Sequence, residues 1–171
     1  MQTILGATGQ IAVELARELE RRHTSDLRLV RRTPRKVNDT DVLAPADLLN
    51  AQQAAEAVKA SSIVYFTAGL PPDTELWQTQ FPVMLKNALD AIRARGVSTH
   101  AVTLHVGPGT SLPVKADDTA DHKMHSEWGE VSEQTTADLN AVRDRGGRTV
   151  RARTTSLRLL ESATPEDGVG Q

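Results

Sequence analysis

The 171-residue chain has no cysteine, few aromatic residues and no long hydrophobic run. The absence of cysteine excludes disulfide bonds, thiolate metal sites and a cysteine nucleophile. Aromatic residues are only 3% of the chain, so the core must be built from Leu, Val, Ile and Ala. No apolar run approaches the roughly 20 residues of a membrane span, and a glycine-rich turn follows Met1 where a signal peptide would lie. We therefore expect a soluble, cytoplasmic, globular protein.

The chain also lacks an excess of charge of either sign. Its net charge is −2 and its pI is about 6.2. This balance indicates neither a nucleic acid nor an anionic membrane surface as a partner. The length fits one domain, or one domain with a small appendage, and is sufficient to bury a sizeable core.

The hydrophobic pattern alternates between short apolar runs and helical periodicity. It predicts strands at 2–5, 26–30, 41–48, 62–67 and 100–106, and helices at 10–22, 51–60 and 73–95. Within the last helix, Pro82 is expected to start a fresh helix or to kink this one. The alternation predicts an α/β fold, a Rossmann-type doubly wound parallel sheet in three α/β/α layers, with a strand order resembling 3-2-1-4-5-6.

The pattern weakens after residue 107. Residues 107–128 are loop-like and residues 129–143 form a weak helical pattern. A strand at 148–153 would carry three arginines, whereas an interior parallel strand is apolar on both faces. This strand is therefore expected at a sheet edge, with an open face, or unformed.

These patterns also define the expected domain organisation. The dinucleotide-binding domain is expected to cover residues 1–157, with its clearest part at 1–106. Residues 158–171 are expected to form a tail, and a substrate domain is expected to be absent.

A glycine turn, Gly-Ala-Thr-Gly-Gln-Ile-Ala at residues 6–12, lies between the first strand and the first helix. Gly6 permits a tight turn, and Gly9 lets backbone N–H groups approach a diphosphate at the positive end of the helix. The small Ala12 lets helix and strand pack closely. An ordinary strand–helix turn also uses glycine, but this context favours a nucleotide site.

With this turn, the chain resembles the extended and atypical short-chain dehydrogenase/reductases, the NAD-dependent epimerase/dehydratase group. Ala46-Asp47-Leu48 and residues 64–70 match the family too, and the resemblance is good over 1–97 and patchy over 98–157. It implies a dinucleotide, a small-molecule substrate and homodimer formation through helix 73–95. The expected cofactor-binding residues are Gly6, Thr8, Gly9, Gln10, Ile11, Arg31, Arg32, Asp47, Leu48, Thr67, Ala68 and Gly69.

Arg31 and Arg32 follow the second strand, at the position that contacts the 2′ substituent of the adenosine ribose. An acidic residue there accepts a hydrogen bond from a 2′-hydroxyl, whereas arginine pairs with a 2′-phosphate. No carboxylate occurs between Asp26 and Asp39. This favours NADP over NAD as the cofactor, with a solvated basic loop as the alternative.

The family's catalytic pair, Tyr-x-x-x-Lys, cannot exist in this chain. The single tyrosine, Tyr65, lies in a predicted strand with Gly69 four residues later. The segment that should carry the pair is 122–129, which contains Lys123 without a preceding phenol. The substitutes for the missing phenol are His122 and His125 as acid–base groups. Thr103 could be the family's hydroxyl residue after strand five, or equally an ordinary strand residue. Two exposed loop histidines are the plainer alternative, and no metal site is expected, because spacing fixes no third ligand.

Three functions remain open from the sequence. One is an NADP-dependent oxidoreductase or epimerase that acts by hydride transfer. The second is a non-catalytic NADP-binding or redox-sensing module, and the third is a truncated, inactive member of the same family. The missing tyrosine favours the last two, and the usual activity of the family favours the first. None of the three includes a nucleic acid or a membrane as a partner.

Overall fold

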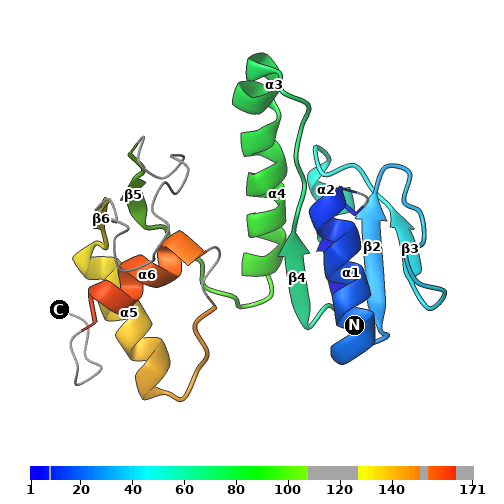
Figure 1. Ribbon diagram of the computed structural model, residues 1–171. Helices are drawn as coiled ribbons and strands as arrows, with labels where there is room; N and C mark the ends of the chain where they lie inside the picture. The colour runs from blue at the N-terminus through cyan, green and yellow to red at the C-terminus, as the bar shows by residue number, and fades with distance from the viewer. Residues whose placement is uncertain (8, 108–126, 151–153, 165–171) are drawn as a thin grey trace, which may run out of the picture. The chain divides into compact units, whose positions relative to one another are not determined.

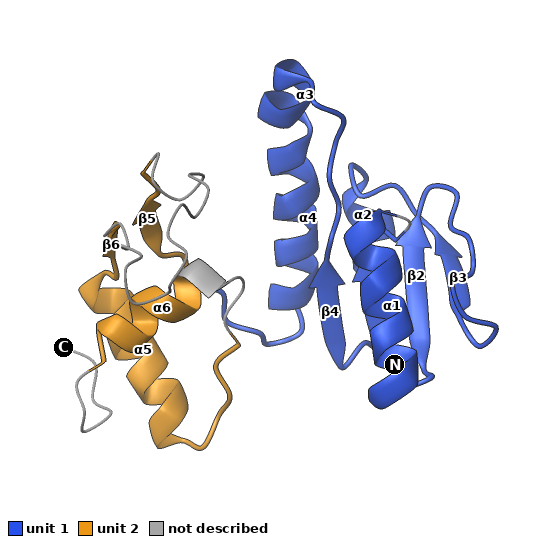
Figure 2. Ribbon diagram, in the orientation of Figure 1, with its two compact units in different colours: residues 1–99 blue, residues 100–171 orange. Residues whose placement is uncertain are grey.

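The computed structural model describes residues 1–7, 9–107, 127–150 and 154–164, and the chain divides into two compact units, 1–99 and 100–171 (Figures 1 and 2). None of the helices in the described part is long and apolar enough to cross a membrane. The first unit consists of β1 (Gln2–Leu5), α1 (Gln10–Arg22), β2 (Leu27–Arg31), β3 (Val42–Pro45), α2 (Ala51–Ala57), β4 (Ile63–Phe66), α3 (Thr74–Thr79) and α4 (Phe81–Arg93).

The first unit is built around a parallel sheet. Within the described residues it has four strands in the order β3-β2-β1-β4, and β1 pairs in parallel with both of its neighbours. The register places Gln2 opposite Leu27 on one side and opposite Ile63 on the other. The predicted α/β class and the first four positions of the predicted strand order are confirmed, and the order is that of a Rossmann-type sheet.

Helices cover both faces of this sheet, as the three-layer prediction requires. Because neighbouring residues of a strand point to opposite faces, Ile4 and Leu5 enter different cores. Ile4 packs on the side of α1, with Ala12 and Ala16. Leu5 packs on the side of α2 and α4, in a core whose helical members are Ala54, Ala57, Ala88 and Ala91. These buried small residues let the helices approach the sheet closely, which compensates for the shortage of aromatic side chains.

The helix predicted at 73–95 is two helices. The side chain of Asp73 caps α3 by accepting a hydrogen bond from the Leu76 N–H at 3.1 Å. Gln80 separates α3 from α4, and Pro82 lies in the first turn of α4, where its missing N–H costs nothing. The expectation of a fresh helix at this proline is confirmed.

The second unit contains β5 (Thr103–His105), β6 (Trp128–Glu130), α5 (Glu133–Asp144) and α6 (Thr154–Ser162). β5 pairs antiparallel with β6, so the prediction that strand 100–106 continues the parallel sheet is wrong. An interior parallel strand is covered on both faces. In β5, Thr103 and His105 are exposed, and Leu104 alone is partly buried.

Two other sequence predictions for this unit have different outcomes. The helical pattern at 129–143 is confirmed as α5, which begins later because Ser132 caps it by accepting from the Thr135 N–H at 3.2 Å. Of the three alternatives for the strand at 148–153, residues 148–150 agree with the unformed one, because they have no regular structure and Val150 is 88% exposed. Residues 151–153 lie outside the described part. Helix α6 includes residues 158–162, the start of the segment expected as a tail.

Gly6, directly after β1, is a position where only glycine fits. Its φ is +88°, and a Cβ there would overlap the backbone of Ala68, at 2.5 Å from the Ala68 nitrogen. Gly9 differs, because its φ is −67° and a Cβ would have no described atom within 4 Å. The close approach of the chain after β1 to the chain after β4 therefore depends on Gly6.

We predict that Gly6→Ala lowers the free energy of unfolding of the first unit by at least about 2 kcal/mol, because it adds backbone overlap to a strained φ. Gly9→Ala is the matched control and should cost about 1 kcal/mol or less, because it only replaces glycine at the helix N-cap. Urea unfolding followed by far-UV circular dichroism measures both. Equal midpoints for the two variants would contradict the geometry at Gly6.

Candidate functional site

The glycine turn of the first unit has the geometry of a strand-to-helix crossover. Gly6 and Ala7 donate backbone hydrogen bonds to the Val30 carbonyl at 2.9 and 3.1 Å, which ties the turn to β2. Gly9 is the N-cap residue of α1, and Gln10 and Ile11 after it are exposed. Thr8 lies outside the described residues. The turn therefore places backbone N–H groups and open space together at the start of α1.

The segment after β4 lies beside this turn. The Thr67 hydroxyl donates to the Leu5 carbonyl at 2.9 Å, and Ala68 lies against Gly6. Gly69 is exposed. The carboxyl ends of β1 and β4 thus bring the predicted residues Gly6, Thr67 and Ala68 together. Their assignment to a bound nucleotide remains a prediction.

The remaining predicted cofactor residues lie after β2 and β3. Arg31, the last residue of β2, and Arg32 after it are both exposed. Asp47 is used locally, because its carboxylate accepts from the Leu49 N–H at 3.0 Å. Leu48 is buried in the core that α2 and α4 share, so its side chain packs rather than faces solvent.

Tyr65, the only tyrosine of the chain, is a structural residue of β4. Its hydroxyl donates to Gln2 Oε1 at 2.9 Å, and burial raises the pKa of this phenol. A phenol with a raised pKa stays protonated at neutral pH, so Tyr65 is unsuited to act as a base. This agrees with the absence of the Tyr-x-x-x-Lys pair.

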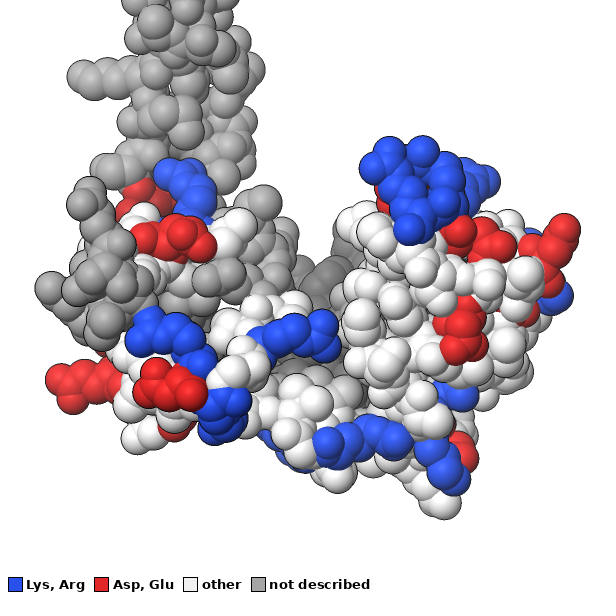
Figure 3. Space-filling model, turned by 90° about the horizontal axis from the view of Figure 1, so that it is seen from below, with Lys and Arg blue, Asp and Glu red and all other residues white. Residues whose placement is uncertain are grey.

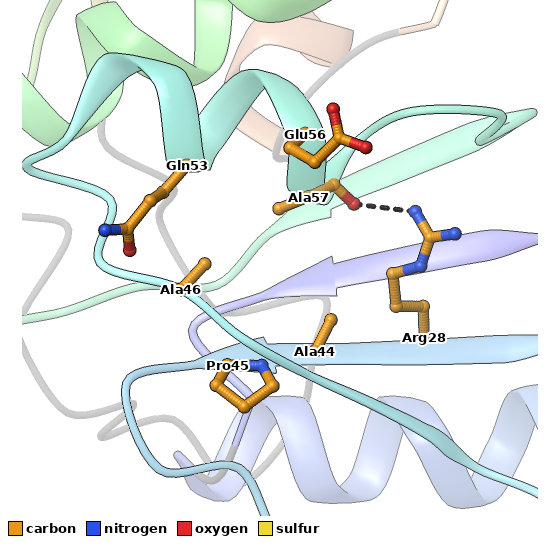
Figure 4. Close-up of a pocket in the computed structure, with 7 residues that line it drawn as sticks. All are labelled: Arg28, Ala44, Pro45, Ala46, Gln53, Glu56 and Ala57. Carbon is orange, nitrogen blue, oxygen red and sulfur yellow. Dashed lines mark hydrogen bonds between the residues drawn. The ribbon is translucent and has the colours of Figure 1, made fainter.

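A pocket of about 340 Å³ lies between the β2–β3 side of the sheet and α2 (Figure 4). It is lined by Arg28, Ala44, Pro45, Ala46, Gln53, Glu56 and Ala57. Its polar groups already have partners. Arg28 donates to the Ala57 and Lys59 carbonyls at 2.9 and 2.8 Å, and Gln53 accepts from the Asp47 N–H at 2.8 Å. Because these groups hold α2 to the sheet, the pocket offers little free polar chemistry to a ligand.

The β5–β6 hairpin of the second unit has two different faces. On the inner face, Leu104 lies opposite Gly129, and a Cβ on Gly129 would be 3.0 Å from Leu159 Cδ1 of α6. On the outer face, His105 pairs across the strands with Trp128, with ring centroids 4.7 Å apart and planes tilted by 43°. Trp128 is 61% exposed. The hairpin therefore holds an aromatic pair open to solvent.

Thr103 and Glu130 extend this outer face. They lie opposite each other in the register, two residues along each strand from His105 and Trp128, and both are exposed. Thr103, predicted as a catalytic hydroxyl, therefore lies at one end of this face. The other three predicted groups, His122, Lys123 and His125, lie outside the described residues.

Solved structures similar to the chain are Rossmann-fold proteins, each covering little more than half of it. The crystal structure of gox2253 is 28% identical with a TM-score of 0.50, covering 57% of this chain and 32% of that one. Uronate dehydrogenase from Agrobacterium tumefaciens is 23% identical with a TM-score of 0.46, covering 56% and 36%. A Rossmann-fold NAD(P)-binding family protein from Shigella flexneri is 25% identical with a TM-score of 0.45, covering 57% and 47%. By class, the first unit is a Rossmann-type α/β unit.

The match to a protein family lies in the second half of the sequence. Residues 82–170, slightly more than half of the chain, match the family model described as queuosine biosynthesis protein. The chain belongs to this family. The S-adenosylmethionine:tRNA ribosyltransferase-isomerases of Brucella ovis and Brucella canis are each 67% identical to it over 81 residues, 47% of this chain and 22% of each relative. The chain thus spans about a fifth of the length of these relatives.

These findings correct the function predicted from the sequence. The prediction of an NADP-dependent oxidoreductase or epimerase is wrong, and so are its non-catalytic and inactive alternatives. The family match and the 67% identity to ribosyltransferase-isomerases point instead to tRNA modification. The predictions of NADP as cofactor and of no nucleic-acid partner are wrong for the same reason. Of the predicted resemblance to short-chain dehydrogenases, only the Rossmann fold of the first unit is confirmed.

The outer face of the hairpin was missed at the sequence level. His105 and Trp128 are far apart in the chain, so no local pattern joins them. One signal was available, since Thr-Leu-His at 103–105 and Trp-Gly-Glu at 128–130 each place a central apolar or small residue between two polar or aromatic ones. Such an alternation is typical of strands with one solvated face.

We predict that Gly129→Ala destabilises the second unit by about 1–3 kcal/mol, because the added methyl presses on α6 and on the Thr103 carbonyl, which is 3.0 Å from the Cβ position. Gly107→Ala is the control, because no described atom lies within 4 Å of its Cβ position. Both variants are made in a Trp77→Phe background, so that urea unfolding is followed by Trp128 fluorescence alone. A Gly129→Ala midpoint equal to that of Gly107→Ala would contradict the inner-face packing.

Proposed function

We propose that residues 82–170 bind tRNA for ribosyl transfer from S-adenosylmethionine. The observation that carries this proposal is the 67% identity over 81 residues to enzymes named for that reaction. Since the chain spans 22% of those relatives, the proposal assigns to it the binding of tRNA, with ribosyl transfer as the reaction that this binding serves. A tRNA substrate also leads us to expect that the protein works in the cytoplasm.

Exposed arginines at the end of α5 support a nucleic-acid surface. Arg143, Arg145 and Arg148 are all exposed, and they lie within six residues of one another at the C-terminal end of this helix. Arginine is well suited to phosphate, because its guanidinium donates two parallel hydrogen bonds. Basic and acidic side chains are intermixed on the face seen in Figure 3, so the cluster is a small group of arginines within a surface of mixed charge. Local clusters of this kind contact individual phosphates without a basic protein overall.

We further propose a kinship of fold between residues 1–97 and the short-chain dehydrogenase/reductases. The strand order β3-β2-β1-β4 and the glycine turn at Gly6 and Gly9 support it. The proposal concerns the origin of the first unit and attributes no hydride transfer to it.

The first test is tRNA binding by the full chain. We expect filter retention of bulk tRNA in preference to a DNA hairpin of equal length. S-adenosylmethionine labelled in the ribose shows whether the chain also completes the reaction, with tRNA from bacteria that lack the ribosyltransferase-isomerase as acceptor. Label in tRNA, or preferential retention without label, supports the proposal. Retention no better than that of the DNA hairpin, with no label transferred, overturns it.

We predict that Arg145→Ala/Arg148→Ala weakens tRNA binding and reduces the slope of log affinity against log salt by about one to two, because each lost phosphate contact releases about one counterion fewer. The matched control is Arg17→Ala/Arg21→Ala on α1 of the first unit, where both arginines pair with glutamates of the same helix. The control should leave the slope unchanged. Equal effects of the two double variants would contradict a tRNA surface at the end of α5.

A further inference from the structure

Exposing the aromatic pair on the outer face of the β5–β6 hairpin to water costs free energy. Trp128 is 61% exposed, although an indole is among the largest apolar groups that a protein can bury. The chain has only two tryptophans. The other one, Trp77, packs on Phe81 with ring centroids 4.7 Å apart and donates from its indole N–H to the Pro71 carbonyl. Trp128, by contrast, keeps most of its surface available to a ligand.

The hairpin fixes the position of this indole. Trp128 lies opposite His105 in the strand register, and the two rings are in contact. Behind the pair, the Cβ position of Gly129 lies 3.0 Å from Leu159 Cδ1 of α6 and 3.1 Å from Leu104 Cδ2, so α6 supports the strands at Gly129. Short aromatic side chains on a supported hairpin lose little entropy on binding. The exposed face of Trp128 is therefore a preorganised surface for a flat ring.

Polar groups at one end of the face suit the edge of a nucleobase. Thr103 and Glu130 lie two residues along their strands from the aromatic pair, which is about 7 Å in an extended chain. That separation is close to the width of a base. The Glu130 carboxylate only accepts hydrogen bonds, whereas the Thr103 hydroxyl both donates and accepts. A carboxylate repels phosphate, so this end of the face favours a base with an amino group over the sugar–phosphate backbone.

We propose that the Trp128–His105 face stacks a nucleobase, and that Glu130 favours bases that carry an exocyclic amino group. The same ring chemistry is present in the adenine of S-adenosylmethionine and in an unstacked base of tRNA. Proteins recognise single-stranded RNA in this way, by stacking on aromatic side chains and hydrogen bonding to base edges. The inference rests on the proposed function, because that function brings both ligands to this unit.

The experiment uses the full chain with Trp77→Phe, which leaves Trp128 as the only tryptophan. S-adenosylmethionine, tRNA, and the single-stranded octamers of adenosine and of uridine are titrated separately, and quenching of Trp128 is measured. We expect saturable quenching, with adenosine octamer bound more tightly than uridine octamer, because adenine has an amino group and uracil has none. Quenching by S-adenosylmethionine alone identifies its adenine as the occupant, and quenching by RNA alone identifies a tRNA base.

Variants at the face separate stacking from folding. Stacking contributes about 1–3 kcal/mol per base, so Trp128→Ala should lower the affinity for the quenching ligand about tenfold. Filter retention measures this affinity for RNA, and calorimetry measures it for S-adenosylmethionine. Trp128→Phe should recover most of the affinity. Glu130→Gln should reduce the difference in affinity between the adenosine octamer and the uridine octamer. Circular dichroism must show the helices of the variants unchanged, and the loss should not depend on salt, unlike the loss in the arginine variants.

The failures of the two proposals differ. If tRNA binds the chain but no ligand quenches Trp128, and Trp128→Ala binds tRNA and S-adenosylmethionine as the parent does, the stacking face is overturned and the proposed function stands. If the parent chain retains tRNA no better than a DNA hairpin and transfers no label to it, the proposed function itself fails. Quenching that is equal for adenosine and uridine octamers would overturn the role of Glu130.

Discussion

The pairing of β5 with β6 decides the architecture of this chain. In the first unit, β1 lies between β2 and β4, and the parallel sheet ends at β4 within the described residues. β5 instead forms an antiparallel hairpin with β6, and Gly129 on its inner face lies close to Leu159 of α6. That pairing places Leu104 and Gly129 on one face of the two strands. It also creates the outer face on which Trp128 and His105 stand.

Much of the first unit could be predicted, because its determinants are local. Apolar runs, helical periodicity and the glycine turn located β1, α1, β2 and β4 to within a residue or two. The break between α3 and α4 followed from Pro82. The partner of β5 could not be predicted in this way, because His-Ala-Val-Thr-Leu-His-Val at residues 100–106 favours a strand whatever it pairs with. Its partner, β6, lies far along the chain, and there Gly129 fits the narrow space beside Leu104 and Leu159.

The function prediction was wrong because it extended a strong local motif, the glycine turn, to the whole chain. The glycine turn is well formed, and Gly6, Thr67 and Ala68 do meet at the ends of β1 and β4. The family match begins only at residue 82 and includes all of the second unit except its last residue. Net charge misled in a similar way. A value of −2 averages over both units and conceals three exposed arginines at the end of α5. Local charge and local aromatic exposure are better indicators of a nucleic-acid surface than the total.

The central claim is that the second half of the chain is the part that contacts tRNA. Ultraviolet cross-linking of the full chain to tRNA, followed by mass spectrometry of the linked peptides, tests it most directly. The account predicts cross-links within residues 82–170, including the peptide that contains Trp128, whose exposed ring would lie against a base. Cross-links confined to residues 1–81, or none above the level of an unrelated Rossmann-fold protein, would contradict it.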